Sequence, residues 1–127
     1  MIHHEYILQK AVCRFLDTKY PNVLYMSDTI ANVKLTKPQQ VRNKAIQKEG
    51  FKCPDLIIFE PRGEYKGLFL ELKIKSPFKK NGDLFKSEHL EGQQKSMMDL
   101  HHKGYYCNFM WDFEAIKNLI DSYMKLI

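Results

Sequence analysis

The chain has 127 residues, 44% of them hydrophobic and 28% charged, a balance that is typical of a globular domain and excludes a disordered segment. No apolar run approaches the ~18 residues that a membrane-spanning helix needs, and the N-terminus lacks the pattern of a secretory leader, so we expect neither membrane association nor secretion. The formal net charge of +5 favours a polyanionic partner, with a solvated basic surface as the alternative.

The 3 cysteines are widely spaced and form no CxxC pair. This number and spacing indicate reduced thiols in a cytoplasmic protein, and they argue against a disulfide framework and against a zinc site. We therefore expect a single cytoplasmic domain over residues 1–127.

The N-terminal stretch predicts an amphipathic helix. Apolar residues recur at helical spacing from Ile7 to Leu16, which predicts a helix over about residues 2–19. The turn residues "YPN" end this helix, and the following "VLYM", residues 23–26, predicts a short strand.

A polar, basic helix is predicted next, over "TKPQQVRNKAIQKEG". It begins at Thr36 or Lys37, has Pro38 in its first turn and stops at Gly50. Positive charge gathers in this stretch and again after residue 71, which favours a surface that contacts the phosphates of nucleic acid. The candidate phosphate-binding residues are Lys37, Arg42, Lys44, Lys48, Lys75, Lys79 and Lys80.

The segment "CPDLIIFEPRGEYKGLFLELKIK", residues 53–75, predicts a β-hairpin whose turn is "PRG". In its second strand, one face is apolar (Leu68, Leu70, Leu72 and Ile74) and the other carries Phe69, Glu71, Lys73 and Lys75. Antiparallel pairing about the turn places Asp55, at the mouth of the first strand, beside Glu71 and Lys73. Two carboxylates and an ammonium then converge at one end of a rigid hairpin.

Such a convergence is the chemistry of a magnesium site for phosphodiester hydrolysis. Mg²⁺ binds one or two carboxylates and completes its shell with water and substrate phosphate. The ion stabilises charge on the phosphate and lowers the pKa of a bound water, which a neighbouring lysine can orient. The alternative is an aspartate at a turn and an exposed Glu–Lys ion pair, each of them common when taken singly.

The rest of the chain predicts a loop, a helix, a strand and a final helix. The loop is "SPFKKNGDLFKSE", and the helix after it runs over about residues 88–103 and is closed by Gly104. The aromatic run "YYCNFMW" is typical of a strand, and the last helix begins near Asp112, a favourable cap. This order of elements predicts an α/β fold with a small mixed β-sheet flanked by helices.

The pair Pro54-Asp55 followed by "ELK" resembles the signature of the PD-(D/E)XK nuclease superfamily. The chain is most similar to the small stand-alone VRR-NUC domains of phages and bacteria, over nearly its whole length. The likeness extends to the segments "HEYILQKAVCRFLDTKYPNVLY", "GLFLELK" and "GQQKSMMDLHHKGYYC". It implies a restriction-endonuclease-like core. One departure is the loop before Pro54. Relatives often carry a glycine directly before the Pro-Asp pair, whereas in this chain the only glycine in that loop is Gly50, four residues before Pro54.

The resemblance also implies roles for individual residues. Asp55, Glu71 and Glu5 correspond to an acidic triad that binds the metal, with help from the carbonyl of Leu72, and Lys73 to the lysine that positions the attacking water. Glu5 lies beside the apolar stripe of its helix, an unusual place for a solvated charge. The alternative for Glu5 is an exposed carboxylate that stabilises the helix dipole.

The glutamine of the family falls at Gln93 or Gln94. Gln93 shares a helix face with Leu90, Met97 and Leu100, so we expect Gln93 to point inward and to orient phosphate or water. Gln94 is the alternative.

These features together predict a Mg²⁺-dependent DNA endonuclease, with Mn²⁺ as a substitute ion, that recognises DNA structure rather than sequence. The analogy with small relatives implies cleavage of branched DNA such as Holliday junctions, by a homodimer that cuts two strands symmetrically, in the host cytoplasm if the chain is phage-encoded. One alternative is a catalytically inactive DNA-binding protein, or a subunit of a larger complex, with the same fold. A basic metabolic or regulatory protein is the third.

Overall fold

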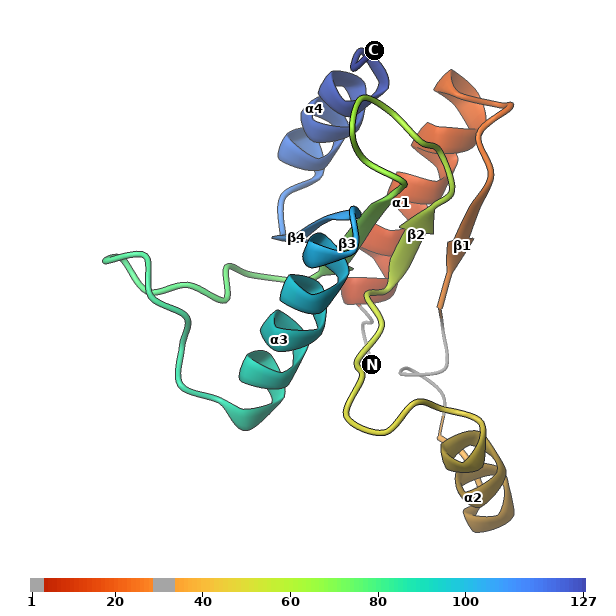
Figure 1. The fold of residues 1–127 in the computed structure, drawn as a ribbon, viewed down its shortest axis with the longest axis vertical. Helices are drawn as coiled ribbons and strands as arrows, with labels where there is room; N and C mark the ends of the chain where they lie inside the picture. The colour runs from red at the N-terminus through yellow and green to blue at the C-terminus, as the bar shows by residue number, and fades with distance from the viewer. Residues whose placement is uncertain (1–3, 29–33) are drawn as a thin grey trace.

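The computed structural model describes residues 4–28 and 34–127. Along the chain the elements are α1 (His4–Lys19), β1 (Tyr25–Ser27), α2 (Lys37–Ala45), β2 (Leu56–Ile58), β3 (Leu68–Leu72), α3 (Glu88–His102), β4 (Tyr106–Met110) and α4 (Phe113–Met124). Figure 1 shows α3 over one face of the sheet and α1 with α4 over the other. The predicted α/β fold is confirmed. Among the described residues, no helix is long and apolar enough to cross a membrane.

The 4 strands found among the described residues form one mixed sheet in the order β1-β2-β3-β4. The pairs β1–β2 and β2–β3 are antiparallel, whereas β3 and β4 are parallel and are connected through α3. In the β2–β3 hairpin, Leu56 pairs with Leu70 and Ile58 with Leu68. The same register continued by one residue places Asp55 opposite Glu71, as the predicted hairpin requires.

The tight turn of this hairpin runs from Arg62 to Tyr65. The backbone N–H of each of these two residues donates to the carbonyl of the other, at 3.1 and 2.9 Å. Gly63 has a φ of 56°, in the left-handed region that glycine adopts without steric cost. The turn therefore needs its glycine, and the register of the whole hairpin depends on it.

The apolar face of β3 lies in the main core. Leu68, Leu70 and Leu72 are fully buried against Val12 and Leu16 of α1 and against Ile116 and Ile120 of α4. The expectation that Ile74 continues this face was wrong, because Ile74 is 58% exposed. The strand ends at Leu72. The N–H of Lys73 makes the last hydrogen bond to β4, to the carbonyl of Met110 at 2.8 Å, and beyond Lys73 the chain leaves the sheet.

The helix ends agree with the predictions except in α2. The first three residues of the chain, up to His3, lie outside the described residues, and the start of the predicted 2–19 helix falls among them. Helix α2 begins after Thr36, whose side chain and that of Gln39 form a capping box, but it ends at Ala45 rather than at Gly50. None of residues 37–45 is buried, so no packing extends this helix beyond its capped first turns.

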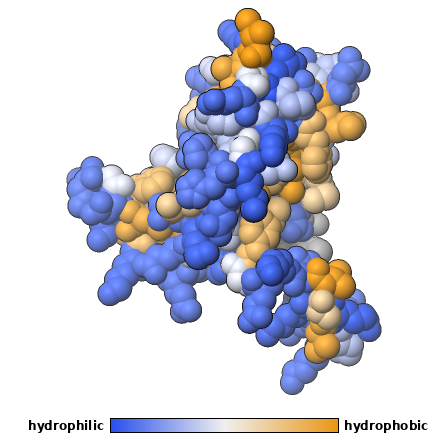
Figure 2. Space-filling view, in the orientation of Figure 1, coloured by the Kyte–Doolittle hydropathy of each residue, from blue (hydrophilic) through white to orange (hydrophobic). Residues whose placement is uncertain are grey.

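Helix α2 also stands away from the rest of the molecule (Figure 1). Figure 2 shows an apolar patch on this helix among polar side chains, and the exposed apolar residues there are Val41 and, directly after the helix, Ile46. The helix contains Lys37, Arg42 and Lys44 and no acidic residue. We call residues 36–46 the basic arm.

Candidate metal centre

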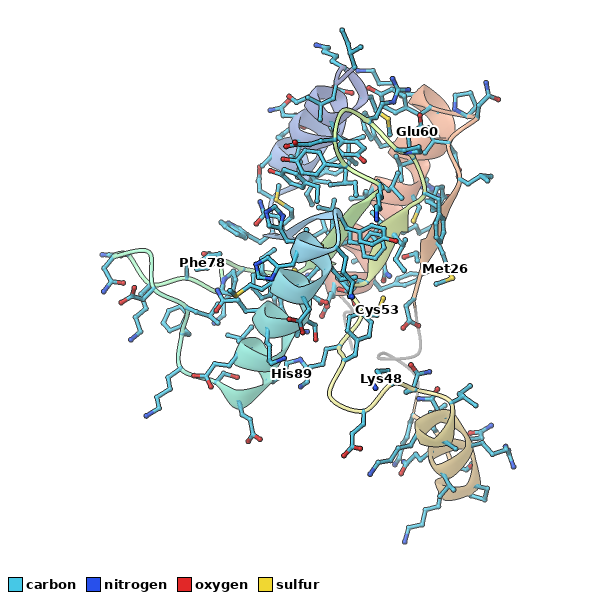
Figure 3. All side chains as sticks on the ribbon, viewed as in Figure 1. Met26, Lys48, Cys53, Glu60, Phe78 and His89 are labelled. Carbon is cyan, nitrogen blue, oxygen red and sulfur yellow. The ribbon has the colours of Figure 1, made fainter. Side chains whose placement is uncertain are left out.

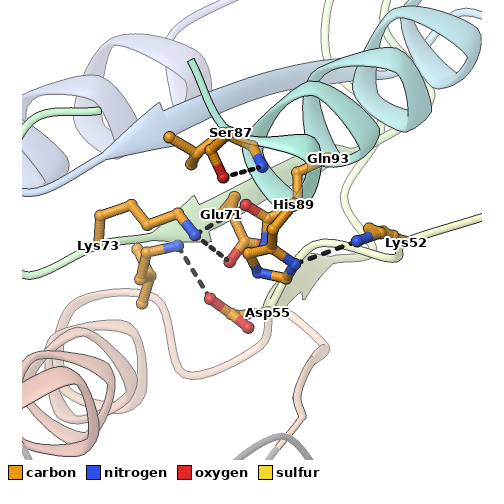
Figure 4. Close-up of polar contacts among 9 residues, drawn as sticks. Lys52, Asp55, Glu71, Lys73, Ser87, His89 and Gln93 are labelled. Atoms are coloured by element: carbon orange, nitrogen blue, oxygen red, sulfur yellow. Dashed lines mark hydrogen bonds and ion pairs between the residues drawn. The ribbon is translucent and has the colours of Figure 1, made fainter. Parts of the chain in front are cut away.

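Three carboxylates from separate elements meet at one end of the sheet. Glu5 comes from the first turn of α1, Asp55 lies directly before β2, and Glu71 belongs to β3. One carboxylate oxygen from each of the three lies within 4.8 Å of the others. Figure 4 shows Asp55 and Glu71 facing the same space, with Lys73 beside them. The structure thus brings together the acidic residues that the sequence singled out.

The hairpin positions two of these carboxylates. An oxygen of Asp55 accepts a hydrogen bond from the backbone N–H of Leu72 at 3.0 Å, which continues the pairing of β2 with β3 by one residue (Figure 4). Glu71 is only 4% exposed and lies on the face of β3 opposite the core leucines. The role of the Leu72 carbonyl as a metal ligand stays a prediction.

The electrostatics of the cluster indicate a lack of positive charge. Burial, the hydrogen bond to Asp55 and the negative charges of Asp55 and Glu5 raise the pKa of Glu71 to about 9, while Lys73 lowers it. Burial, followed by the charge of Asp55, also raises the pKa of Glu5. A divalent cation would neutralise this crowding, and three carboxylates are the oxygen donors that a hard ion such as Mg²⁺ binds. The residues present therefore fit a magnesium ion.

The ammonium of Lys73 is held beside the cluster by Gln93. Lys73 Nζ donates to Gln93 Oε1 at 2.7 Å and lies 3.9 Å from Glu71 Oε2. Gln93 is 7% exposed, on the face of α3 that covers the sheet. Gln94 instead lines a separate groove with His101 and other residues of α3 and β4. Of the two glutamines, Gln93 faces the acidic cluster.

A further buried glutamine, Gln9, supports the site, a role that was not predicted from the sequence. It is 5% exposed, and its Nε2 donates to Ser27 Oγ at 2.5 Å and to the carbonyl of Asp28 at 2.9 Å. The N–H of Asp28 in turn donates to the carbonyl of Asp55 at 2.8 Å. Gln9 thus ties α1, which carries Glu5 one turn earlier, to the segment that carries Asp55. Its place one turn after Glu5, on the buried stripe of α1, was the signal in the sequence.

A groove of about 340 Å³ opens beside the cluster. Glu5, Lys73 and the exposed ring of Phe85 line this groove; the other lining residues are Ile74, Lys75, Ser76, Pro77 and Leu90. A groove lined by both apolar and charged groups suits a nucleotide, whose base is apolar on its faces and whose phosphate is anionic.

The predicted phosphate-binding residues are all exposed, but the structure does not gather them into one patch. Lys37, Arg42, Lys44 and Lys48 belong to the basic arm and the segment after it, Lys79 and Lys80 to the loop before α3, and Lys75 to the groove beside the cluster. Figure 1 shows the loop and the arm projecting in different directions.

The comparisons with known proteins bear on the fold. No protein-family model matches the chain, and no curated protein matches it. A solved structure described as a "VRR_NUC domain protein" is similar to it, with a TM-score of 0.63 and 21% sequence identity over 99% of this chain and 92% of that chain. At 21% sequence identity, this likeness concerns the fold. The chain therefore has a VRR-NUC-like nuclease fold.

Proposed function

We propose that the chain is a metal-dependent DNA endonuclease that acts as a single domain over residues 1–127. The observation that carries this proposal is the meeting of Glu5, Asp55 and Glu71 within 4.8 Å, beside a lysine that a buried glutamine holds in place. The nuclease-type fold supports the same conclusion.

Asp55 and Glu71 would hold the ion, Glu5 would bind it or its waters, and the carbonyl of Leu72 would contribute a further oxygen. When bound, Mg²⁺ supplies a Lewis acid at the scissile phosphate and makes a coordinated water more acidic. Mn²⁺, which binds the same type of oxygen ligands, is the expected substitute.

The amino acids themselves provide orientation. Lys73 has three N–H donors, of which Gln93 accepts one, so the remaining donors are available to a water molecule and to a phosphate oxygen. The buried amide of Gln93 limits the positions that the ammonium can occupy. Lys73 therefore offsets negative charge in the transition state from a fixed position, where electrostatic stabilisation is most effective.

DNA structure rather than base sequence is the proposed basis of recognition. The basic arm and the loop with Lys79 and Lys80 carry positive side chains that suit phosphates, and such contacts carry no sequence information. Branched DNA such as a Holliday junction offers phosphates in several directions, which matches basic groups that project from different parts of the molecule. A homodimer would contain two metal centres related by two-fold symmetry and so could cut two DNA strands symmetrically.

The test is cleavage of a panel of four-way junction, flap, duplex and single-stranded DNA with Mg²⁺, Mn²⁺ or EDTA. We expect nicking in Mg²⁺ and none in EDTA, and we expect Asp55→Ala and Lys73→Ala to lose cleavage while retaining DNA binding. Lys95→Ala is the matched control, because Lys95 lies on α3 with a side chain that is 77% exposed.

Two outcomes would contradict the proposal. DNA binding without cleavage in either metal would indicate a catalytically inactive DNA-binding protein. The absence of salt-sensitive DNA binding would indicate a function outside nucleic-acid chemistry.

A further inference from the structure

Lys52, directly before the Cys53-Pro54-Asp55 segment, is clamped against α3. Its backbone N–H donates to Oγ of the buried Ser96 at 2.8 Å, and its Nζ lies 3.1 Å from Nδ1 of His89. His89 and Ser96 are seven residues apart in sequence, two turns of helix, and so lie on one face of α3. Figure 3, in which Cys53 and His89 are labelled, shows this segment and the start of α3 facing each other.

Gly92 provides the space for this contact. It lies between His89 and Ser96, and a Cβ atom added at Gly92 would lie 2.9 Å from Cε and 3.3 Å from Cδ of Lys52. A glycine inside a helix costs stability relative to alanine. The close passage of the Lys52 side chain gives a physical reason for a glycine at this position.

The contact with Lys52 also determines where the imidazole of His89 carries its proton. An ammonium can only donate, so Nδ1 of His89 must accept, and the proton of the neutral ring lies on Nε2. Partial burial and the charges of Lys52 and Lys73 lower the pKa of His89, and the charge of Asp55 raises it. The Nε2–H group is thus a donor whose direction Lys52 sets.

The ring borders the acidic cluster and is exposed. In the view of Figure 4, His89 lies between Lys52 and the carboxylates, and the charges of Asp55 and Lys73 both act on its pKa. Neither Lys52 nor His89 belongs to the group of three carboxylates, and the hydrogen-bond partner of Lys73 is Gln93. Both remain accessible to a substrate that enters the centre.

We propose that His89 and Lys52 form a phosphate-binding subsite for the DNA phosphate next to the scissile one. The Nε2–H of His89 donates to an oxygen of this phosphate, and Lys52 fixes the orientation of the ring and adds positive charge. The subsite rests on the proposed nuclease function, which it deepens by naming a second point of contact with the DNA backbone.

Two histidine variants test the hydrogen bond. In His89→Gln the amide nitrogen reaches near the position of Nε2, whereas in His89→Asn the shorter amide reaches only the position of Nδ1. We expect His89→Asn to lower kcat/KM for DNA cleavage about 10- to 100-fold, as loss of a hydrogen bond to a charged group does. His89→Gln should stay within about 3-fold of the wild type, since it keeps a donor of the same strength.

Two further variants test the role of Lys52. Lys52→Met removes the charge, and Gly92→Ala displaces the Lys52 side chain without removing any charge. Both should lower kcat/KM, and Gly92→Ala should melt at the wild-type temperature or above it, since alanine favours the helix. A loss of activity without a loss of stability separates this account from simple misfolding. Lys95→Met is the control on the same helix.

DNA binding in EDTA, measured as a function of salt, tests the subsite independently of cleavage. Lys52→Met should reduce the slope of log affinity against log salt by about 1, as the removal of a single phosphate-binding cation does. Wild-type affinity and slope in Lys52→Met, together with wild-type kcat/KM in His89→Asn, would overturn the subsite and leave the nuclease proposal standing. Failure of the wild type to cleave any DNA would overturn the nuclease proposal instead.

Discussion

The ammonium of Lys73 is bound to the buried amide of Gln93 at 2.7 Å, while the nearest oxygen of Glu71 is 3.9 Å away. The partner that fixes Lys73 is therefore a neutral side chain on α3, and the carboxylate stays available to a cation. The position of the lysine depends on the packing of α3 against the sheet.

The first prediction concerns Gln93. Replacement by alanine should lower kcat about 10- to 100-fold with little change in DNA affinity, because a displaced catalytic group costs rate rather than binding. Single-turnover cleavage together with a binding titration measures the two effects. Gln94→Ala is the matched control, since Gln94 lines the other groove and should behave as the wild type. Equal losses in both variants would show that Gln93 acts only through the stability of α3.

The second prediction follows from the pKa of Glu71, which rises from its ordinary value of 4.5 to about 9 in the folded protein. Between these two pH values the native state binds a proton that the unfolded state has released, so the free energy of unfolding falls as the pH rises. Above about 9 both states are ionised and the stabilisation from this proton is gone. Thermal melts of the metal-free protein should therefore show decreasing stability from about pH 5 to about pH 9.

Glu71→Gln tests the origin of this dependence. The variant keeps the shape of the protonated side chain, so the metal-free protein should be more stable than the wild type by roughly 1–3 kcal/mol at pH 8. It should also lose the increase in melting temperature that Mg²⁺ gives the wild type. A wild-type pH profile in Glu71→Gln would mean that another group causes the slope.

The third prediction concerns Gln9, which connects α1 to Ser27 and Asp28. Gln9→Ala leaves the half-buried hydroxyl of Ser27 and carbonyl of Asp28 without this donor and should cost about 1–3 kcal/mol of stability. Because Glu5 is carried by the same helix, the affinity for Mn²⁺ should fall as well. Arg14→Ala, an exposed position on α1, is the control for both measurements. Unchanged Mn²⁺ affinity in Gln9→Ala would show that Glu5 is positioned without it.

The fourth prediction concerns the basic arm. Since none of residues 37–45 is buried, the triple change Lys37→Gln, Arg42→Gln and Lys44→Gln should leave the melting temperature unchanged. It should weaken DNA binding and lower the salt slope by about 0.9 for each phosphate that the arm no longer neutralises. Lys125→Gln, after α4 at the other end of the molecule in Figure 1, is the control. An unchanged salt slope would show that the arm does not contact DNA.

Local patterns predicted the parts of the site that depend on one element or one turn. The turn at Gly63 and the alternation along β3 determine the register that places Asp55 opposite Glu71. The spacing along α3 likewise pointed to the inward position of Gln93. In such cases the period of the secondary structure is enough to identify the face on which a side chain lies.

Contacts between distant segments were beyond the reach of these patterns. Lys52 and His89 lie 37 residues apart, and nothing local to either residue indicates the other. Ile74 continues the alternation of β3, but the chain leaves the sheet before it, and only the tertiary structure determines where a strand ends. Tertiary structure also explains why α2 ends early. No residue of α2 is buried, and a helix that does not pack against other elements has only the helix propensity of its own residues to stabilise it.

The most direct test of the metal centre is X-ray diffraction from crystals soaked in Mn²⁺, with the ion located by its anomalous signal. We predict a peak between Asp55 and Glu71, bonded to oxygens of both side chains and with Glu5 bound to it or to its waters. We also predict that the peak is absent from Asp55→Asn crystals soaked in the same way. Wild-type crystals with no peak there, or with manganese bound only at other carboxylates, would contradict the assignment of this cluster as a metal centre.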